Sequence, residues 1–169
     1  MAVKPNVEPL DIEATFEEEG LDARALITRT DTKGIITFAS PAYRQMTKYS
    51  KEELIGKPHS IVRHPLMPEA AFKEMWDTIK QGKHWEGMVR NLRKDGKYYW
   101  VIVQIDPIDE NGNIIYDKPE KIAGYVAVRR EPSRSEVEEA DKLYRSMRRA
   151  ELLAKSKLKD REEELLNKL

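Results

Sequence analysis

The sequence contains no cysteine among its 169 residues. This absence excludes disulfides, thiolate metal sites, a cysteine nucleophile and any cofactor bond through sulfur. The chain has no net charge, with 30 basic and 30 acidic side chains, whereas proteins that wrap nucleic acid need a basic surface. No apolar stretch reaches the ~20 residues of a membrane-spanning helix, and a signal-peptide pattern is absent. We therefore expect a cytoplasmic protein that binds no nucleic acid and does not insert into a membrane.

The neutral total combines three unlike segments. Residues 1–24 carry seven acids and two bases, a net charge of −5, whereas residues 25–130 carry +5 and residues 131–169 are neutral. The middle segment contains all three tryptophans and seven of the eight glycines. Aromatic and turn residues gather where a chain reverses and buries surface. We expect an acidic leader or cap over 1–24, the compact domain over 25–130 and a C-terminal signalling or coiled-coil helix over 131–169.

The N-terminal arm allows two interpretations. Ile12 and Phe16 have helical spacing, which predicts a short acidic helix around Asp11–Gly20 that packs Phe16 and Leu21 on the domain. The alternative is a solvated leader without regular structure.

The C-terminal arm has a helical pattern to its end, with Ser135 as the predicted N-cap residue. Heavy charge surrounds a broken apolar stripe, which favours a coiled-coil or partner-docking helix. The stripe consists of Leu143, Met147, Ala150, Ala154, Leu158, Leu165 and Leu169. The alternative is a solvated helix that frays beyond Ala150.

The middle segment alternates between strand and helix signals. β-rich runs predict strands over 26–30, 35–39, 85–93, 98–107 and 122–128. Asp31–Gly34 is a hairpin signal, Ser50 begins a capping box, and a longer helix is expected between Pro68 and Gly82. This order predicts an α+β fold, a five-stranded antiparallel sheet with short helices on one face and a pocket between them.

Several motifs of the middle segment occur together in one known family. They are Gly56-Lys57-Pro58-His59, Val62-Arg63-His64-Pro65, Met67-Pro68, Ala70-Ala71-Phe72, Met75-Trp76, Trp85-Glu86-Gly87 and Asn91-Leu92-Arg93-Lys94-Asp95-Gly96 with Tyr99-Trp100-Val101. The segment resembles a PAS domain, and more narrowly the FAD-binding PAS domains of bacterial aerotaxis receptors. The resemblance implies a redox sensor for energy taxis that holds FAD without a covalent bond.

The resemblance also implies the residues of the FAD site. A non-covalent flavin needs an apolar slot, polar groups at the ring edge and cations at the pyrophosphate. A tryptophan provides a ring and an N–H donor, an asparagine provides donor and acceptor, and an arginine binds phosphate. The expected site residues are Arg63, His64, Trp76, Trp85, Asn91, Ser40 and Tyr99.

Two positions depart from the aerotaxis pattern. Leu66 stands where those receptors have an acidic residue, and Ser40-Pro41 replaces Asn-Asp. Because Ser40 lacks an amide, a flavin contact there is lost or replaced by water.

The resemblance implies partners as well. Aerotaxis receptors continue into membrane-spanning, HAMP and methyl-accepting regions, which this sequence lacks. We therefore expect the stand-alone PAS half of a two-protein energy-taxis receptor, of the CetB type. Its partner is a membrane-bound chemotaxis transducer with HAMP and signalling regions, and the chain itself is expected to form a homodimer at the inner face of the membrane. The alternative to a stand-alone protein is a fragment of a longer receptor.

Simpler interpretations remain for the same residues. Trp76 and Trp100 are also typical of a hydrophobic core. Asn91 can serve to satisfy backbone groups next to a turn, and His64 can serve to order a loop. The three histidines lack metal-ligand spacing, so no metal site is expected, and no catalytic motif is present. The alternatives to a flavin sensor are a cofactor-free PAS dimerisation module and a PAS sensor of haem or another small ligand.

Overall fold

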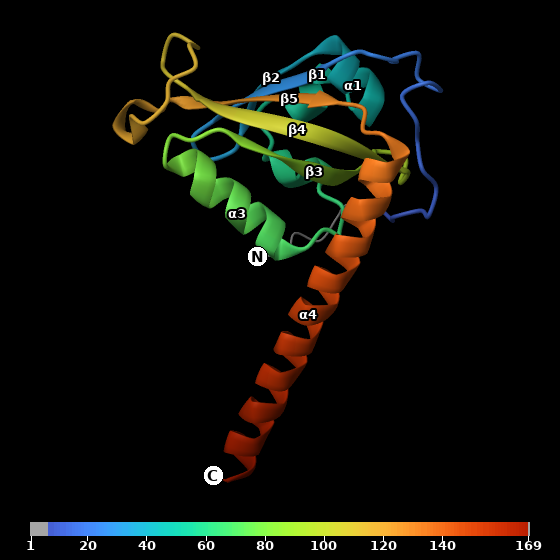
Figure 1. Cartoon of the computed structure of the whole chain (residues 1–169), viewed down its shortest axis with the longest axis vertical. Helices are drawn as coiled ribbons and strands as arrows, with labels where there is room; N and C mark the ends of the chain where they lie inside the picture. Colours follow the sequence, from blue (N-terminus) through green and yellow to red (C-terminus); the bar gives the residue numbers. More distant parts are fainter. Residues whose placement is uncertain (1–6, 169) are drawn as a thin grey trace.

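The computed structural model describes residues 7–168. Five strands form one antiparallel sheet in the order β2-β1-β5-β4-β3. They are β1 (Leu26–Asp31), β2 (Ile36–Ala39), β3 (Trp85–Leu92), β4 (Tyr98–Ile108) and β5 (Gly124–Arg130). The expected α+β fold is confirmed (Figure 1). The last strand lies two residues later than predicted, because 122–123 still belong to the connection that follows a short 3-10 turn, η2 (Pro119–Lys121).

The predicted turns form for the expected reasons. Between β1 and β2, the carboxylate of Asp31 accepts hydrogen bonds from the amides of Lys33 and Ile35, at 2.8 and 3.0 Å. Gly34 adopts a φ of 84°, which favours glycine. This hairpin brings β2 to one edge of the sheet, and Asp95-Gly96 turns β3 into β4 at the opposite edge.

The two faces of the sheet differ because side chains alternate along each strand. The inner face is covered by the helices α1 (Pro41–Thr47), α2 (Lys51–Leu54) and α3 (Glu69–Lys80), together with the 3-10 turn η1 (His59–Val62). Ser40 caps α1, and Ser50 and Glu53 form the predicted capping box of α2. The main core lies between these helices and the inner face.

The outer face carries the start of a 34-residue helix, α4 (Arg134–Asn167). Its N-cap is Ser133, in a capping box with Glu136, so the prediction of Ser135 is wrong by two positions. Val137 and Ala140 pack against Trp100 on the outer face. Farther along, α4 passes the beginning of α3 and extends away from the sheet (Figure 1). Within residues 7–168, no helix is long and apolar enough to cross a membrane.

The N-terminal arm contains no helix at Asp11–Gly20, so that prediction is wrong. Glu13 instead forms a single bridge with Tyr98, and the chain then makes turns over 16–20. Phe16 and Leu21 are nevertheless buried in the main core, as the capping interpretation expected. The arm is attached by tertiary contacts, because the backbone amide of Ala14 bonds to the carbonyl of Tyr98 at 2.7 Å.

Candidate functional site

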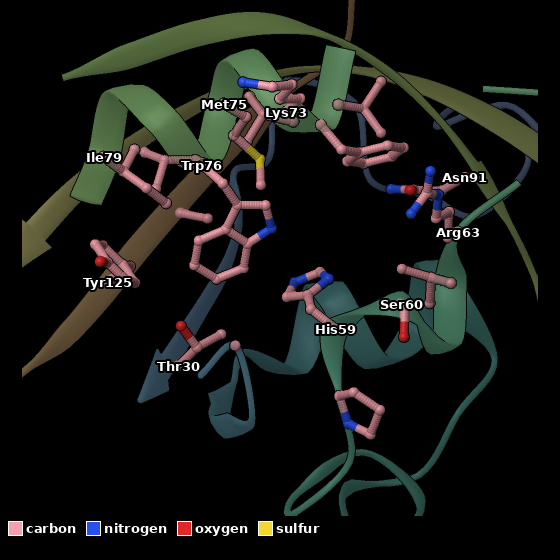
Figure 2. Close-up of a pocket in the computed structure, with 18 of the residues that line it drawn as sticks. Thr30, His59, Ser60, Arg63, Lys73, Met75, Trp76, Ile79, Asn91 and Tyr125 are labelled. Atoms are coloured by element: carbon pink, nitrogen blue, oxygen red, sulfur yellow. The ribbon is translucent and has the colours of Figure 1, made fainter. Parts of the chain in front are cut away.

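A cavity of about 720 Å³ lies between the inner face of the sheet, α3 and η1. This volume falls within the range of small-molecule sites, ~300–1,000 Å³. Figure 2 shows Trp76, Met75 and Ile79 approaching from α3 and His59 from η1 on the opposite side. The apolar part of the lining consists of Val62, Phe72, Met75, Trp76, Ile79, Val89, Val103, Ile105 and Ala127.

Trp76 forms one wall of the cavity. Its ring meets the ring of Tyr125 edge-on, with the centroids 5.8 Å apart. Gly34 lies against the other side, where a β-carbon would come within 3.1 Å of the indole. The close approach of the β1–β2 turn therefore holds the tryptophan ring in place.

Asn91 and Arg63 form the polar end of the cavity. Their backbones make an isolated antiparallel bridge, so the two side chains lie side by side (Figure 2). The amide of Asn91 donates a long hydrogen bond to the hydroxyl of Tyr99, at 3.5 Å. The guanidinium of Arg63 lies 4.0 Å from the ring centre of Phe72, and burial lowers the pKa of Arg63. Arg63 stays charged, as arginine does in proteins, and has no carboxylate within 4.0 Å among the described residues.

A second guanidinium lines the cavity from β5. Arg129 is only 3% exposed and donates hydrogen bonds to Thr28 Oγ1 at 3.0 Å and to His59 Nε2 at 2.7 Å. Burial, and secondarily the charge of Arg129, lower the pKa of His59 to about 3. The imidazole is therefore neutral, and its Nε2 acts as an acceptor.

The mouth of the cavity is bordered by α4. The carboxylate of Glu151 accepts hydrogen bonds from the backbone amides of Glu69 and Ala70, at 3.0 and 3.1 Å. Lys155, one turn farther along α4, pairs with Glu69 at 3.1 Å. The helix α4 therefore contacts the first turn of α3, whose next turns line the cavity.

Three of the seven expected site residues line this cavity: Arg63, Trp76 and Asn91. Tyr99 is adjacent, since it pairs with Asn91 across β3 and β4 and is fully buried behind it. The structure thus brings together the amide, the aromatic wall and one cation that the resemblance implied.

The other three expected residues do not line the cavity. Ser40 serves as the N-cap of α1 and also accepts a hydrogen bond from the amide of Ile27 at 3.1 Å. His64 is buried, and its Nδ1 accepts a hydrogen bond from the amide of Leu66 at 3.1 Å, which orders the loop. Trp85 lies on the inner face of β3, folded over Gly87, with no partner for its indole N–H in the described part of the chain.

Sequence reasoning missed several polar residues of the lining, and two of them, Arg129 and His59, are hydrogen-bonded to each other. His59 was part of a family motif and was excluded as a metal ligand, but it was not predicted to line the site. Arg129 follows Tyr125 and Ala127 at the two-residue period of the inner face, so a strand extended to 130 would have placed it inside.

Comparison with solved structures supports the fold. A light-oxygen-voltage domain studied with a flavin analogue superposes with a TM-score of 0.55 at 21% identity, covering 84% of this chain and 90% of the other. The light state of the Aureochrome1 LOV domain gives a TM-score of 0.54 at 21% identity, covering 76% and 99%. Residues 36–118 also match the family described as the PAS fold. This part of the chain is a PAS domain.

Curated relatives of this PAS domain are signalling proteins. The Aerotaxis receptor of Escherichia coli K12 is 38% identical over 126 residues, which is 75% of this chain and 23% of the receptor. The Nitrogen fixation regulatory protein of Klebsiella pneumoniae is 33% identical, over 51% of this chain and 17% of that protein. Biofilm dispersion protein BdlA of Pseudomonas aeruginosa is 23% identical, over 56% and 23%. The matched region is thus less than a quarter of each of these relatives.

Proposed function

We propose that the chain is a redox sensor for energy taxis that binds FAD non-covalently in the cavity of its PAS domain. It acts as a sensor and not as an enzyme. The observation that carries the proposal is the composition of the cavity: an apolar slot, an amide beside it, and two guanidiniums that have no carboxylate within 4.0 Å among residues 7–168. Glu69 and Glu151 also line the cavity, and their charges act on Arg63 from farther away. The resemblance to aerotaxis PAS domains supports the same ligand.

The residues of the cavity suit the parts of FAD. Trp76, Phe72 and Met75 provide an apolar wall for the ring system, and Asn91 offers both a donor and an acceptor to a ring edge that presents both. Arg63 is the phosphate-binding candidate, because a guanidinium forms paired hydrogen bonds with phosphate. When bound, FAD supplies a ring whose electron count follows the redox state of its surroundings.

The response of the protein begins at Asn91 in this proposal. A change in the hydrogen-bonding pattern of the ring edge requires the amide to exchange its donor and acceptor sides, and the present bond to Tyr99 is long enough to be replaced. Because the backbone of Asn91 is bridged to Arg63, the change extends to the loop before α3. The first turn of α3 then transmits it to Glu151 on α4.

The proposed partner is a membrane-bound chemotaxis transducer with HAMP and signalling regions, which would hold the chain in the cytoplasm at the inner face of the membrane. The docking surface we assign to it is the part of α4 after Ala150, where five leucines are more than half exposed: Leu152, Leu153, Leu158, Leu165 and Leu166. The expected homodimer stays a prediction, which light scattering of the purified chain checks.

The absorption spectrum of the purified full chain tests the proposal. We expect a flavin band at ~450 nm that bleaches on reduction. Arg63→Gln should weaken FAD binding by roughly tenfold or more, because it removes one charge-assisted hydrogen bond to phosphate. The same change should leave the affinity for riboflavin, which lacks the phosphates, nearly unchanged.

Arg145→Gln is the matched control, because Arg145 is exposed on α4 and pairs only with Asp141 among the described residues. It should bind both flavins like the wild type. A colourless protein that takes up no added FAD contradicts the proposal. A haem band or a different ligand found by mass spectrometry would favour the alternative sensor, and dimers that persist without flavin would favour the interaction module.

A further inference from the structure

The two successive arginines at the end of β5 have opposite environments. Arg130 points to the outer face, where its exposed guanidinium lies 3.6 Å from the carboxylate of Glu136. Arg129 points to the inner face, is 3% exposed and lines the cavity. Among residues 7–168, no carboxylate lies within 4.0 Å of the Arg129 guanidinium.

Every described partner of Arg129 is electrically neutral. The guanidinium donates to Thr28 Oγ1, to the carbonyl of Leu26 at 3.5 Å and to His59 Nε2. It also lies 4.9 Å from the ring centre of Tyr43. Burial raises the pKa of Tyr43 to about 12, so the phenol stays protonated and supplies no negative charge.

A buried charge without a counter-charge is unfavourable, because the protein interior solvates it poorly. Stability alone would favour an apolar side chain at this inner-face position, like those of Val103 and Ala127 nearby. The remaining side of Arg129 faces the cavity, so a ligand is what can supply the missing negative charge.

We propose that Arg129 is a ligand-binding residue that faces an electron-rich edge of the bound ring and makes the cavity favour the negatively charged, reduced form of that ring. This inference rests on the proposed function and adds the charge state that the site selects. Two electrons from a reductant and one proton from solvent leave a flavin ring with one added negative charge. With dithionite as the reductant, the dithionite is oxidised to sulfite. The Coulomb attraction of a buried cation for that charge is stronger than in water.

The decisive variant is Arg129→Met, with Arg130→Met as the matched control on the opposite face. Loss of the guanidinium leaves Thr28 and His59 satisfied, because Thr28 Oγ1 lies 3.2 Å from His59 Nε2 and its hydroxyl can donate there. The only other hydrogen bond lost among the described residues is the long one to the carbonyl of Leu26, at 3.5 Å. We therefore expect ligand-free Arg129→Met to unfold at the same denaturant concentration as the wild type or a higher one. A merely structural arginine would lower that concentration.

The measurement is the dissociation constant of FAD for each full-length variant, oxidised in air and reduced with dithionite under anaerobic conditions. Arg129→Met should weaken the binding of reduced FAD at least about tenfold more than that of oxidised FAD, which lowers a two-electron midpoint potential by about 30 mV. Arg129→Lys should retain most of the preference, and Arg130→Met should behave as the wild type.

The outcomes separate this inference from the proposed function. Equal changes in the two dissociation constants of Arg129→Met, or none, overturn the role of Arg129 while FAD binding by the wild type still supports the sensor. A wild type that binds no FAD overturns both. The contact between Arg129 and His59 can also be tested without a ligand. The pKa of His59, about 3 in the wild type, should rise in Arg129→Met when it is measured by NMR. An unchanged pKa contradicts the position of the Arg129 guanidinium beside His59.

Discussion

Replacement of Glu151 by alanine should loosen the attachment of α4 to the cavity. The helix α3 begins after Pro68, which offers no side-chain cap. The two carboxylate oxygens of Glu151 take that role from α4, since they accept hydrogen bonds from Glu69 N at 3.0 Å and from Ala70 N at 3.1 Å. The negative charge is also favourable at the N-terminus of a helix.

The magnitude follows from the capping contact. Loss of an N-cap side chain costs about 1 kcal/mol, with a range of about 0.5–2. Because this cap bridges two helices, its loss should appear as easier local opening of α4 and of the first turn of α3. A change of about 1 kcal/mol makes the opening equilibrium about fivefold more favourable.

Amide hydrogen exchange measured by mass spectrometry is the assay. Peptides that cover residues 69–75 and 148–156 should exchange about fivefold faster in Glu151→Ala, whereas peptides from β4 and β5 should keep their protection. Glu163→Ala is the matched control, because this exposed acid on α4 makes no hydrogen bond or ion pair within the described residues. Equal acceleration in the two variants would refute the bridging role of Glu151.

Two further predictions concern the attachment of the other segments. Tyr144→Phe removes the hydroxyl that donates to the carbonyl of Met88 at 2.6 Å, so urea denaturation should show a loss of about 1 kcal/mol; wild-type stability would contradict this contact. Burial alone would raise the pKa of Glu19, but hydrogen bonds and charges from Lys48 and Arg93 outweigh it and lower the pKa below 4.5. The carboxylate therefore stabilises the fold above its unfolded pKa, and this contribution is lost as the pH falls through the lower folded value. Glu19→Gln should flatten the decline of the urea midpoint between neutral pH and about pH 3, and an acid sensitivity equal to the wild type would count against the ion-pair cluster.

The predictable parts of the fold are those with local causes. The β1–β2 turn follows from the reach of one aspartate carboxylate to two nearby amides and from a glycine at positive φ. The capping box at Ser50 is likewise a three-residue relation. At the start of α4 the same relation joins Ser133 to Glu136, and the prediction of Ser135 failed because the spacing was read from the wrong serine.

The N-terminal arm shows where periodicity misleads. Ile12 and Phe16 have helical spacing, yet the arm pairs once with the start of β4 at Glu13 and then turns. Ile12 is half exposed, and Phe16 is buried by the domain instead of by a helical face. Tertiary packing decides the conformation of such a short segment, because an isolated helix of ten residues is marginal in water.

The lining residues that sequence could predict are those whose chemical type suits a role in the site. It could not predict those whose position in the lining depends on the pairing register of a strand. Trp76, Asn91 and Arg63 were expected in the site, and all three line the cavity. Arg129 and Arg130 are chemically identical neighbours, and only the pairing of β5 with β1 and β4 determines which of them is buried. The sequence analysis ended this strand at Val128, two residues too early, so it assigned neither arginine to a face of the sheet.

The contacts of α4 offer a physical route for the coupling that the proposed function requires between the cavity and the far end of this helix. The helix is held at the outer face by Val137 and Ala140, at the edge strand by Tyr144, and at the cavity mouth by Glu151. The first two contacts are made on the far side or the edge of the sheet, whereas Glu151 both lines the cavity and caps α3. A ligand shifts an equilibrium only through contacts that differ between the two states. Of these attachments, the one at Glu151 adjoins the cavity, so under the proposed function it is there that a change in charge within the cavity would alter the position of α4.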